Sequence, residues 1–150
     1  MSKNLSRLLA LCLVSAGVSI AAADCSILSA AEVQKLTGTA VHDIAKQSQP
    51  GAGGTCANYA TDNGKLYLGV NQLTSASDYN TAVAAVPQSV YPKREKLTDV
   101  GDEAVLMKDE SGMLRYLVAR KGNRGVVLFP FHHGPNDEQL KKLAVQALSH

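Results

Sequence analysis

Two groups of side chains in the sequence have the types and spacing that chemistry requires. His132 and His133 stand next to each other, and imidazoles are common metal ligands and proton-transfer groups. Asp102 and Glu103 are also adjacent, and two carboxyl groups can act as acid and base when one is buried and the other solvated. These four side chains raise the hypothesis of a small enzyme or metal-binding protein.

Each group also has a simpler interpretation, which we favour. Neighbouring side chains of a strand point to opposite faces, so His132 and His133 can share a metal only if the backbone turns there. Gly101 before Asp102 is typical of a tight turn, in which glycine supplies backbone freedom and aspartate a local hydrogen bond. His42 and His150 can join only through the fold. We therefore assign no catalytic, metal-binding or cofactor-binding residue and leave open whether the chain is an enzyme.

Other motifs in the chain are weaker. The segment Pro50–Thr55 resembles a phosphate-binding loop only in its glycine content, and it lacks the Gly-Lys-Ser/Thr ending. Five Tyr, two Phe and no Trp disfavour a sugar-stacking platform. Two basic clusters could meet anionic glycans or lipid headgroups, although solvated turns commonly have this composition. The clusters are Arg120, Lys121 and Arg124, and Lys93, Arg94 and Lys96.

Residues 1–23 have the organisation of a secretory signal peptide. Lys3 and Arg7 precede the uncharged apolar run Leu8–Ile20, and Ala21–Ala23 supplies a small-residue cleavage signal. The apolar run is shorter than the ~20 residues that a membrane-spanning helix needs. A lipoprotein carries a small residue directly before its modified cysteine, whereas Asp24 precedes Cys25. We expect a soluble periplasmic or secreted protein consisting of one domain, residues 24–150.

The charge and the cysteine content of residues 24–150 further restrict the class of protein. The leader holds Lys3 and Arg7 and no acidic residue, so 13 of the 15 basic residues remain against 13 acidic ones, and the net charge is zero. This balance does not indicate a nucleic-acid-binding protein. Two cysteines remain, Cys25 and Cys56, and an even number in an exported chain predicts a disulfide bond.

Capping and stop signals in the sequence predict three helices. Ser29 and Glu32 form a capping box for the first, and Gly38 ends it. The second covers about Ser77 to Val86 and is stopped by Pro87. The third starts at Asn136 and has an amphipathic pattern. Its apolar face consists of Leu140, Leu143, Ala144, Ala147 and Leu148.

Strand signals fill the intervals between the helices. They cover Thr39–Lys46, Thr55–Thr61, Lys65–Leu73, Glu103–Lys108, Met113–Lys121 and Gly125–Phe131. Short turns within each triplet require antiparallel pairing, and Gln47–Gly54 and Pro87–Asp99 are expected loops. The order α-βββ-α-βββ-α predicts an α+β domain with an antiparallel sheet covered by helices. Val127, Phe129 and Phe131 lie on one side of the last strand, where we expect them to meet the final helix.

Several short segments resemble a family of small exported bacterial domains of unknown function. They are Cys25–Val33, Gly38, Gly54–Tyr59 and Val100–Ala104, which give a Cys…Gly-x-Cys…Gly-Asp-Glu-Ala pattern. That family includes many lipoproteins of actinobacterial cell envelopes. The resemblance implies a disulfide that ties the first helix to the first hairpin and a fold like that of the photosystem subunit PsbP. It implies no catalytic residues.

These observations favour a non-catalytic binding or interaction module whose partner is an unidentified protein or envelope component. The alternative is a small periplasmic enzyme or metal-binding protein that uses His132 or His133 with Asp102 and Glu103. The two hypotheses differ in geometry. An enzyme needs a histidine and the carboxylates in one concave pocket, whereas a binding module does not.

The leader and the disulfide can be tested together on the exported protein. We expect its intact mass to equal that of residues 24–150 less two hydrogens, because Ala23 ends the cleavage signal and Cys25 bonds to Cys56. Reduction should raise the mass by two hydrogens. An N-terminus at Met1, or a diacylglycerol adduct on a cysteine, would contradict the prediction.

Overall fold

The computed structural model describes residues 27–44 and 55–150 of the chain. The expected leader 1–23, Cys25 and the expected loop 47–54 lie outside the described residues, and so does the side chain of Cys56. The cleavage site and the Cys25–Cys56 disulfide therefore stay predictions. Among the helices of the described part, none is long and apolar enough to cross a membrane.

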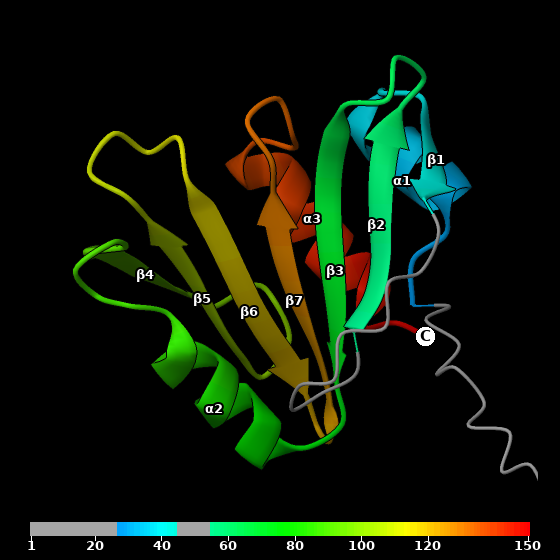
Figure 1. The fold of residues 1–150 in the computed structure, drawn as a ribbon. Coiled ribbons are helices and arrows are strands. Elements are labelled where there is room, and N and C mark those ends of the chain that lie inside the picture. Colours follow the sequence, from blue (N-terminus) through cyan, green and yellow to red (C-terminus); the bar gives the residue numbers. More distant parts are fainter. Residues whose placement is uncertain (1–26, 45–54) are drawn as a thin grey trace, which may run out of the picture.

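The described chain is an α+β fold with one antiparallel sheet, as expected (Figure 1). Its helices are α1 Ala30–Thr37, α2 Ala76–Ala85 and α3 Asp137–Ala147. Its strands are β1 Val41–Ile44, β2 Thr55–Thr61, β3 Leu66–Leu73, β4 Lys93–Leu97, β5 Glu103–Lys108, β6 Arg115–Lys121 and β7 Arg124–Pro130. The spatial order is β1-β2-β3-β7-β6-β5-β4, so β7 joins the two hairpin-linked sets by pairing with β3.

Helices lie on both faces of the sheet. In Figure 1, α1 and α3 lie behind it and α2 lies in front of its lower part. The rear core holds Leu140 and Leu143 of α3 against Leu117 and Leu128 of the sheet. The front core is smaller and places Tyr79 of α2 among another set of sheet residues. Those residues are Leu73, Val105, Met107, Val118 and Val127.

One strand lies where the sequence predicted a loop. The segment Pro87–Asp99 contains β4, which pairs only with β5 and forms one edge of the sheet. Its residues Lys93–Lys96 are exposed and charged, and only Leu97 is buried. Charged side chains protect an edge strand against pairing with other chains, but they remove the apolar alternation by which a strand is recognised in sequence.

The expected contact between Phe129 and the final helix is wrong. Val126 and Leu128 of β7 belong to the core under α1 and α3, whereas Val127 and Phe129 face the α2 side. Strand β7 is apolar on both faces, so its sequence does not indicate which face α3 covers. The aromatic side of β7 is therefore turned toward the face that α2 covers only in part.

A bulge also changes the expected alternation of β3. Tyr59 pairs with Leu68 and the next residue of β2, Ala60, pairs with Leu66, so Tyr67 is the extra residue. Tyr67 and Leu68 are both buried in the rear core, and Leu66 is 44% exposed. In the sequence, Leu66, Leu68 and Val70 alternate with Lys65, Tyr67 and Asn71, a pattern that predicts a strand with one wet face, with Leu66 buried and Tyr67 exposed. The bulge reverses both because it resets the side-chain alternation.

The capping box of α1 forms as predicted and also ties α1 to the end of the chain. Glu32 Oε2 accepts a hydrogen bond of 2.8 Å from the backbone N–H of Ser29, while its Oε1 lies 2.8 Å from His150 Nε2 and 2.8 Å from Gln146 Nε2. These contacts, led by the Ser29 backbone hydrogen bond, lower the pKa of Glu32 from 4.5 to about 2. Helices α1 and α3 thus pack together behind the sheet.

The position of Leu143 predicts the contribution of α3 to stability. Its side chain is fully buried between the helix and the sheet, so we expect Leu143→Ala to lower the free energy of unfolding by about 2–5 kcal/mol. The exposed Lys142 beside it is the matched control, and Lys142→Ala should change stability by less than about 0.5 kcal/mol. Urea unfolding curves of both variants measure the difference, and equal midpoints would show that α3 is not part of the core.

Candidate binding surface

The structure separates the two groups that the enzyme hypothesis would combine. Glu103 starts β5 and pairs with Arg120, which in turn pairs with Gly125 near the start of β7. Strand β7 ends at Pro130, five residues beyond Gly125, and His132 follows this end. At about 3.3 Å per residue, the histidines lie more than about 16 Å from the carboxylates. They do not share a pocket.

The two carboxylates are engaged in structural contacts. Asp102 Oδ2 accepts a hydrogen bond of 2.7 Å from the backbone N–H of Gly122, and so holds the turn between β6 and β7. Glu103 Oε2 lies 2.5 Å from Arg120 Nε in an ion pair. Gly101 adopts φ +63°, which L-residues rarely adopt. The segment is therefore the tight turn that the sequence favoured.

The histidines occupy a turn rather than a strand. The backbone turns directly after β7, and the rings of His132 and His133 lie 4.4 Å apart instead of on opposite faces. Both side chains are exposed. Within residues 27–44 and 55–150, no group of three or more His, Cys, Asp or Glu side chains could hold a metal ion. The pair alone does not make a metal centre.

A row of aromatic rings crosses the front face of the sheet. The ring centroids are 6.2 Å apart for Tyr91 and Tyr116, 6.0 Å for Tyr116 and Phe129, and 5.9 Å for Phe129 and Phe131. We call these four residues the aromatic row. They are more than half of the seven aromatic residues of the chain, and all four are half-buried. An aromatic-poor protein thus concentrates its rings on one surface.

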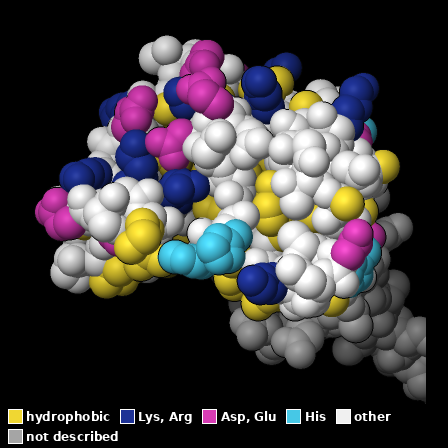
Figure 2. Space-filling view, turned by 90° about the horizontal axis from the view of Figure 1, so that it is seen from above, with side chains coloured by type: hydrophobic (Ala, Val, Ile, Leu, Met, Phe, Trp, Pro, Cys, Tyr) yellow, Lys and Arg dark blue, Asp and Glu magenta, His cyan; other side chains and the backbone are white. Residues whose placement is uncertain are grey.

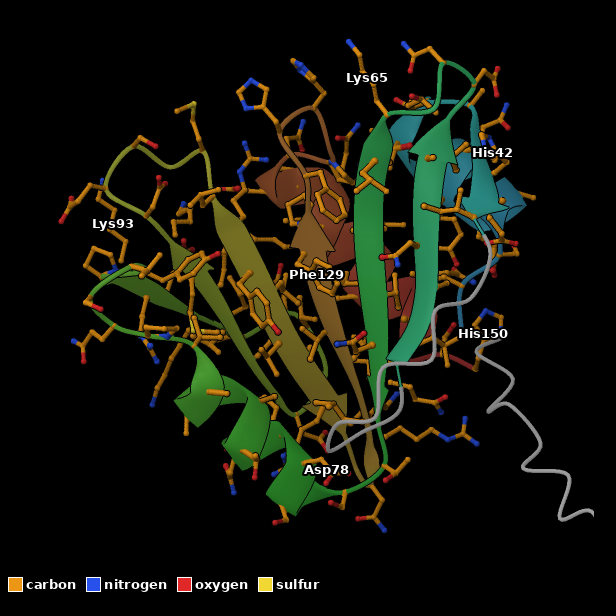
Figure 3. The ribbon with its side chains drawn as sticks, in the orientation of Figure 1. His42, Lys65, Asp78, Lys93, Phe129 and His150 are labelled. Atoms are coloured by element: carbon orange, nitrogen blue, oxygen red, sulfur yellow. The ribbon has the colours of Figure 1, made fainter. Side chains whose placement is uncertain are left out.

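The aromatic row lies beyond the area that α2 covers. Figure 3 shows Phe129 on the front of the sheet, above the helix. Burial and the neighbouring Tyr91 raise the pKa of Tyr116 above its usual value, so the Tyr116 ring is uncharged near neutral pH. Of the described helices, α1 and α3 pack on the opposite face. As far as the described residues show, the rings lie on the sheet and keep part of their surface exposed.

Apolar side chains continue this surface to the upper end of the sheet. Leu66 starts β3 beside the end of β7, and Met113 and Leu114 lie in the turn before β6. Their exposed fractions are 44%, 58% and 48%. Figure 2, which looks down on this end, shows hydrophobic side chains at the surface near the histidines. Exposed apolar side chains near a row of aromatic rings are consistent with an interaction site.

Gly69 makes room for the centre of the row. It pairs with Phe129 across β3 and β7, and a Cβ atom at position 69 would lie 2.0 Å from Phe129 Cε2. The Phe129 ring therefore lies directly over the glycine backbone. A glycine inside a strand often marks such a close approach, and this is the one local signal by which the sequence points to the aromatic row.

Only some side chains of the two basic clusters form ion pairs or hydrogen bonds. In the first, Arg120 pairs with Glu103, and Lys121 and Arg124 are exposed at the hairpin tip. In the second, Lys93 lies 3.7 Å from Glu110, and Arg94 donates a hydrogen bond of 2.6 Å to the carbonyl oxygen of Val86. Neither cluster belongs to the aromatic row.

Comparison with known proteins gives no assignment, because no family model, curated protein or solved structure matches the chain. The resemblance to exported bacterial domains and to PsbP therefore stays an expectation from the sequence.

The contact between Gly69 and Phe129 predicts a specific coupling in stability. Gly69→Ala should lower the free energy of unfolding by about 1–3 kcal/mol, because the new methyl group overlaps the ring. In a Phe129→Ala background the same change should be neutral or slightly stabilising, since alanine has a lower backbone entropy than glycine in the unfolded chain. Urea unfolding of the two single variants and the double variant measures the coupling. If Gly69→Ala lowered the free energy of unfolding equally in both backgrounds, the result would contradict the contact.

Proposed function

We propose that this protein is an exported, non-catalytic binding module that holds an apolar segment of another protein on the aromatic row. The observation that carries the proposal is the position of the four half-buried rings on a rigid sheet, next to the exposed Leu66, Met113 and Leu114. Buried aromatic anchors on a rigid support contribute much of the binding energy in protein interfaces.

The orientation of the rings favours side chains of a protein over sugars. Tyr116 and Phe129 are nearly parallel, at 14°, but Tyr91 is turned 60° from Tyr116, and Phe131 is turned 66° from Phe129. Stacking of successive sugar rings needs a series of parallel flat faces. The row instead has two edge-to-face contacts around one stacked pair, an uneven apolar surface that suits branched or aromatic side chains better than flat sugar rings.

The polar groups support a non-catalytic role. The Asp102 and Glu103 carboxylates are engaged in a turn and an ion pair, and the histidines lie at the opposite end of the sheet. The alternative of an enzyme built from these groups thus loses its geometric basis. Export is supported by the sequence of residues 1–23, which has the three zones of a signal peptide.

Site-specific photo-crosslinking tests the proposal in the producing cells. Benzoylphenylalanine at position 116 replaces one aromatic side chain of the row by another and should give a discrete crosslinked protein band. The control position is Val145, which is 47% exposed on α3, behind the sheet, and should not give that band. Phe129→Ala should reduce the crosslink from position 116, because it removes the central ring.

Two results would overturn the proposal. One is the absence of any protein crosslink from position 116 in folded, exported protein. The other is the same set of crosslinks from positions 116 and 145, because it would show non-specific contact. Circular dichroism of each variant establishes that the fold is retained.

A further inference from the structure

A recess lies on the α2 side of the sheet, at the edge that β4 forms. It has a volume of about 550 Å³ and lies between α2, β4 and the start of β5. On the α2 side its apolar side chains are Val83 of α2 and Val105 of β5, whereas Leu97 and Ala104, which also line it, belong to the rear core. Cavities of about 300–1,000 Å³ with a mainly apolar lining are typical of small-molecule sites. None of the four residues of the aromatic row lines it.

Two basic and two acidic side chains line this cavity, and they differ in how they are paired. Glu103 forms an ion pair with Arg120, and Asp102 is bonded to a backbone N–H. Arg94 and Lys96 line the same cavity, and among the described residues neither has a carboxylate within ion-pair distance. Two cations thus face the cavity without an acidic partner, while both acids are already engaged.

The two cations are positioned by β4. They are two residues apart on one strand, so their side chains leave the sheet on the same face at a spacing of about 7 Å. The hydrogen bond from Arg94 Nη2 to the carbonyl oxygen of Val86 holds the guanidinium at the end of α2. The remaining N–H groups of a guanidinium can bind a carboxylate in a planar, two-pronged arrangement.

We infer that the cavity between α2, β4 and β5 binds a small acid with an apolar body, with its carboxylate on Arg94 and Lys96. The apolar body packs on Val83 and Val105, and Tyr79 lines the same wall. An inorganic anion would leave the apolar lining unfilled, and a neutral apolar molecule would leave both cations without a partner. The combination of lining and charge therefore selects an amphipathic acid, such as a fatty acid or an aromatic acid.

A titration with three matched probes tests this inference. Decanoate carries both features, decanol has the tail without the charge, and acetate has the charge without the tail. We expect decanoate to shift the amide NMR signals around the cavity in the ¹⁵N-labelled protein. Decanol should bind at least about tenfold more weakly than decanoate, and acetate should cause no saturable shift. The affinity for phenylpropionate, compared with that for decanoate, shows whether the cavity prefers an aromatic acid or a fatty acid.

Variants separate the two parts of the cavity. Lys96→Gln should weaken decanoate binding about tenfold, which corresponds to the loss of one charge-assisted hydrogen bond, and should leave decanol binding unchanged. Lys121→Gln, at the exposed hairpin tip, is the matched control and should change neither. Val83→Trp places a large ring in the cavity and should abolish binding of both probes.

The inference is overturned if decanoate shifts no signals of the cavity, if it binds no better than decanol, or if Lys121→Gln weakens it as much as Lys96→Gln. Shifts centred on Tyr116 and Phe129 would also overturn it, since they would place the acid on the aromatic row. The crosslinking from position 116 is a separate readout, so the binding of protein segments and the binding of small acids can fail independently.

Discussion

The structure depends on the apolar character of the central strands on both of their faces. Val126 and Leu128 of β7 pack under α1 and α3, while Val127 and Phe129 pack on the other side. Burial of apolar surface stabilises the fold on each face. Within the described residues, two helices cover the rear face and the ten residues of α2 cover the front. The front face is therefore covered in part, and its uncovered part is where the aromatic row lies.

The row is also rigid because of its support. Phe129 lies over Gly69 at the pairing of β3 and β7, where the two sets of strands join. A contact at this junction makes the position of the central ring depend on the whole sheet rather than on a loop. Binding sites carried by rigid elements lose less conformational entropy when a partner binds. This explains how a protein with few aromatic residues can present a defined apolar surface.

The two proposed sites use different chemistry because they lie in different parts of the sheet. The aromatic row crosses β6 and β7 near the centre, where side chains are apolar on both faces. The cavity lies against β4, an edge strand, where Arg94 and Lys96 can stay hydrated. Helix α2 lies in front of the lower part of the sheet in Figure 1 and contributes Tyr79 and Val83 to the cavity wall. One face of one small sheet thus offers an apolar surface and a recess lined by Arg94 and Lys96.

The sequence by itself determined the elements that local chemistry defines. The capping box at Ser29, the start of the last helix at Asn136, the α+β order and the tight turn at Gly101 were all predictable, because caps, turns and alternation depend on neighbouring residues. Only the tertiary structure decided which face of β7 meets α3, that Lys93–Leu97 is an edge strand, and that Tyr91, Tyr116, Phe129 and Phe131 form one row. These features arise from pairing between segments far apart in the chain. A strand that is apolar on both faces, or charged at an edge, carries no local pattern that could reveal its partner.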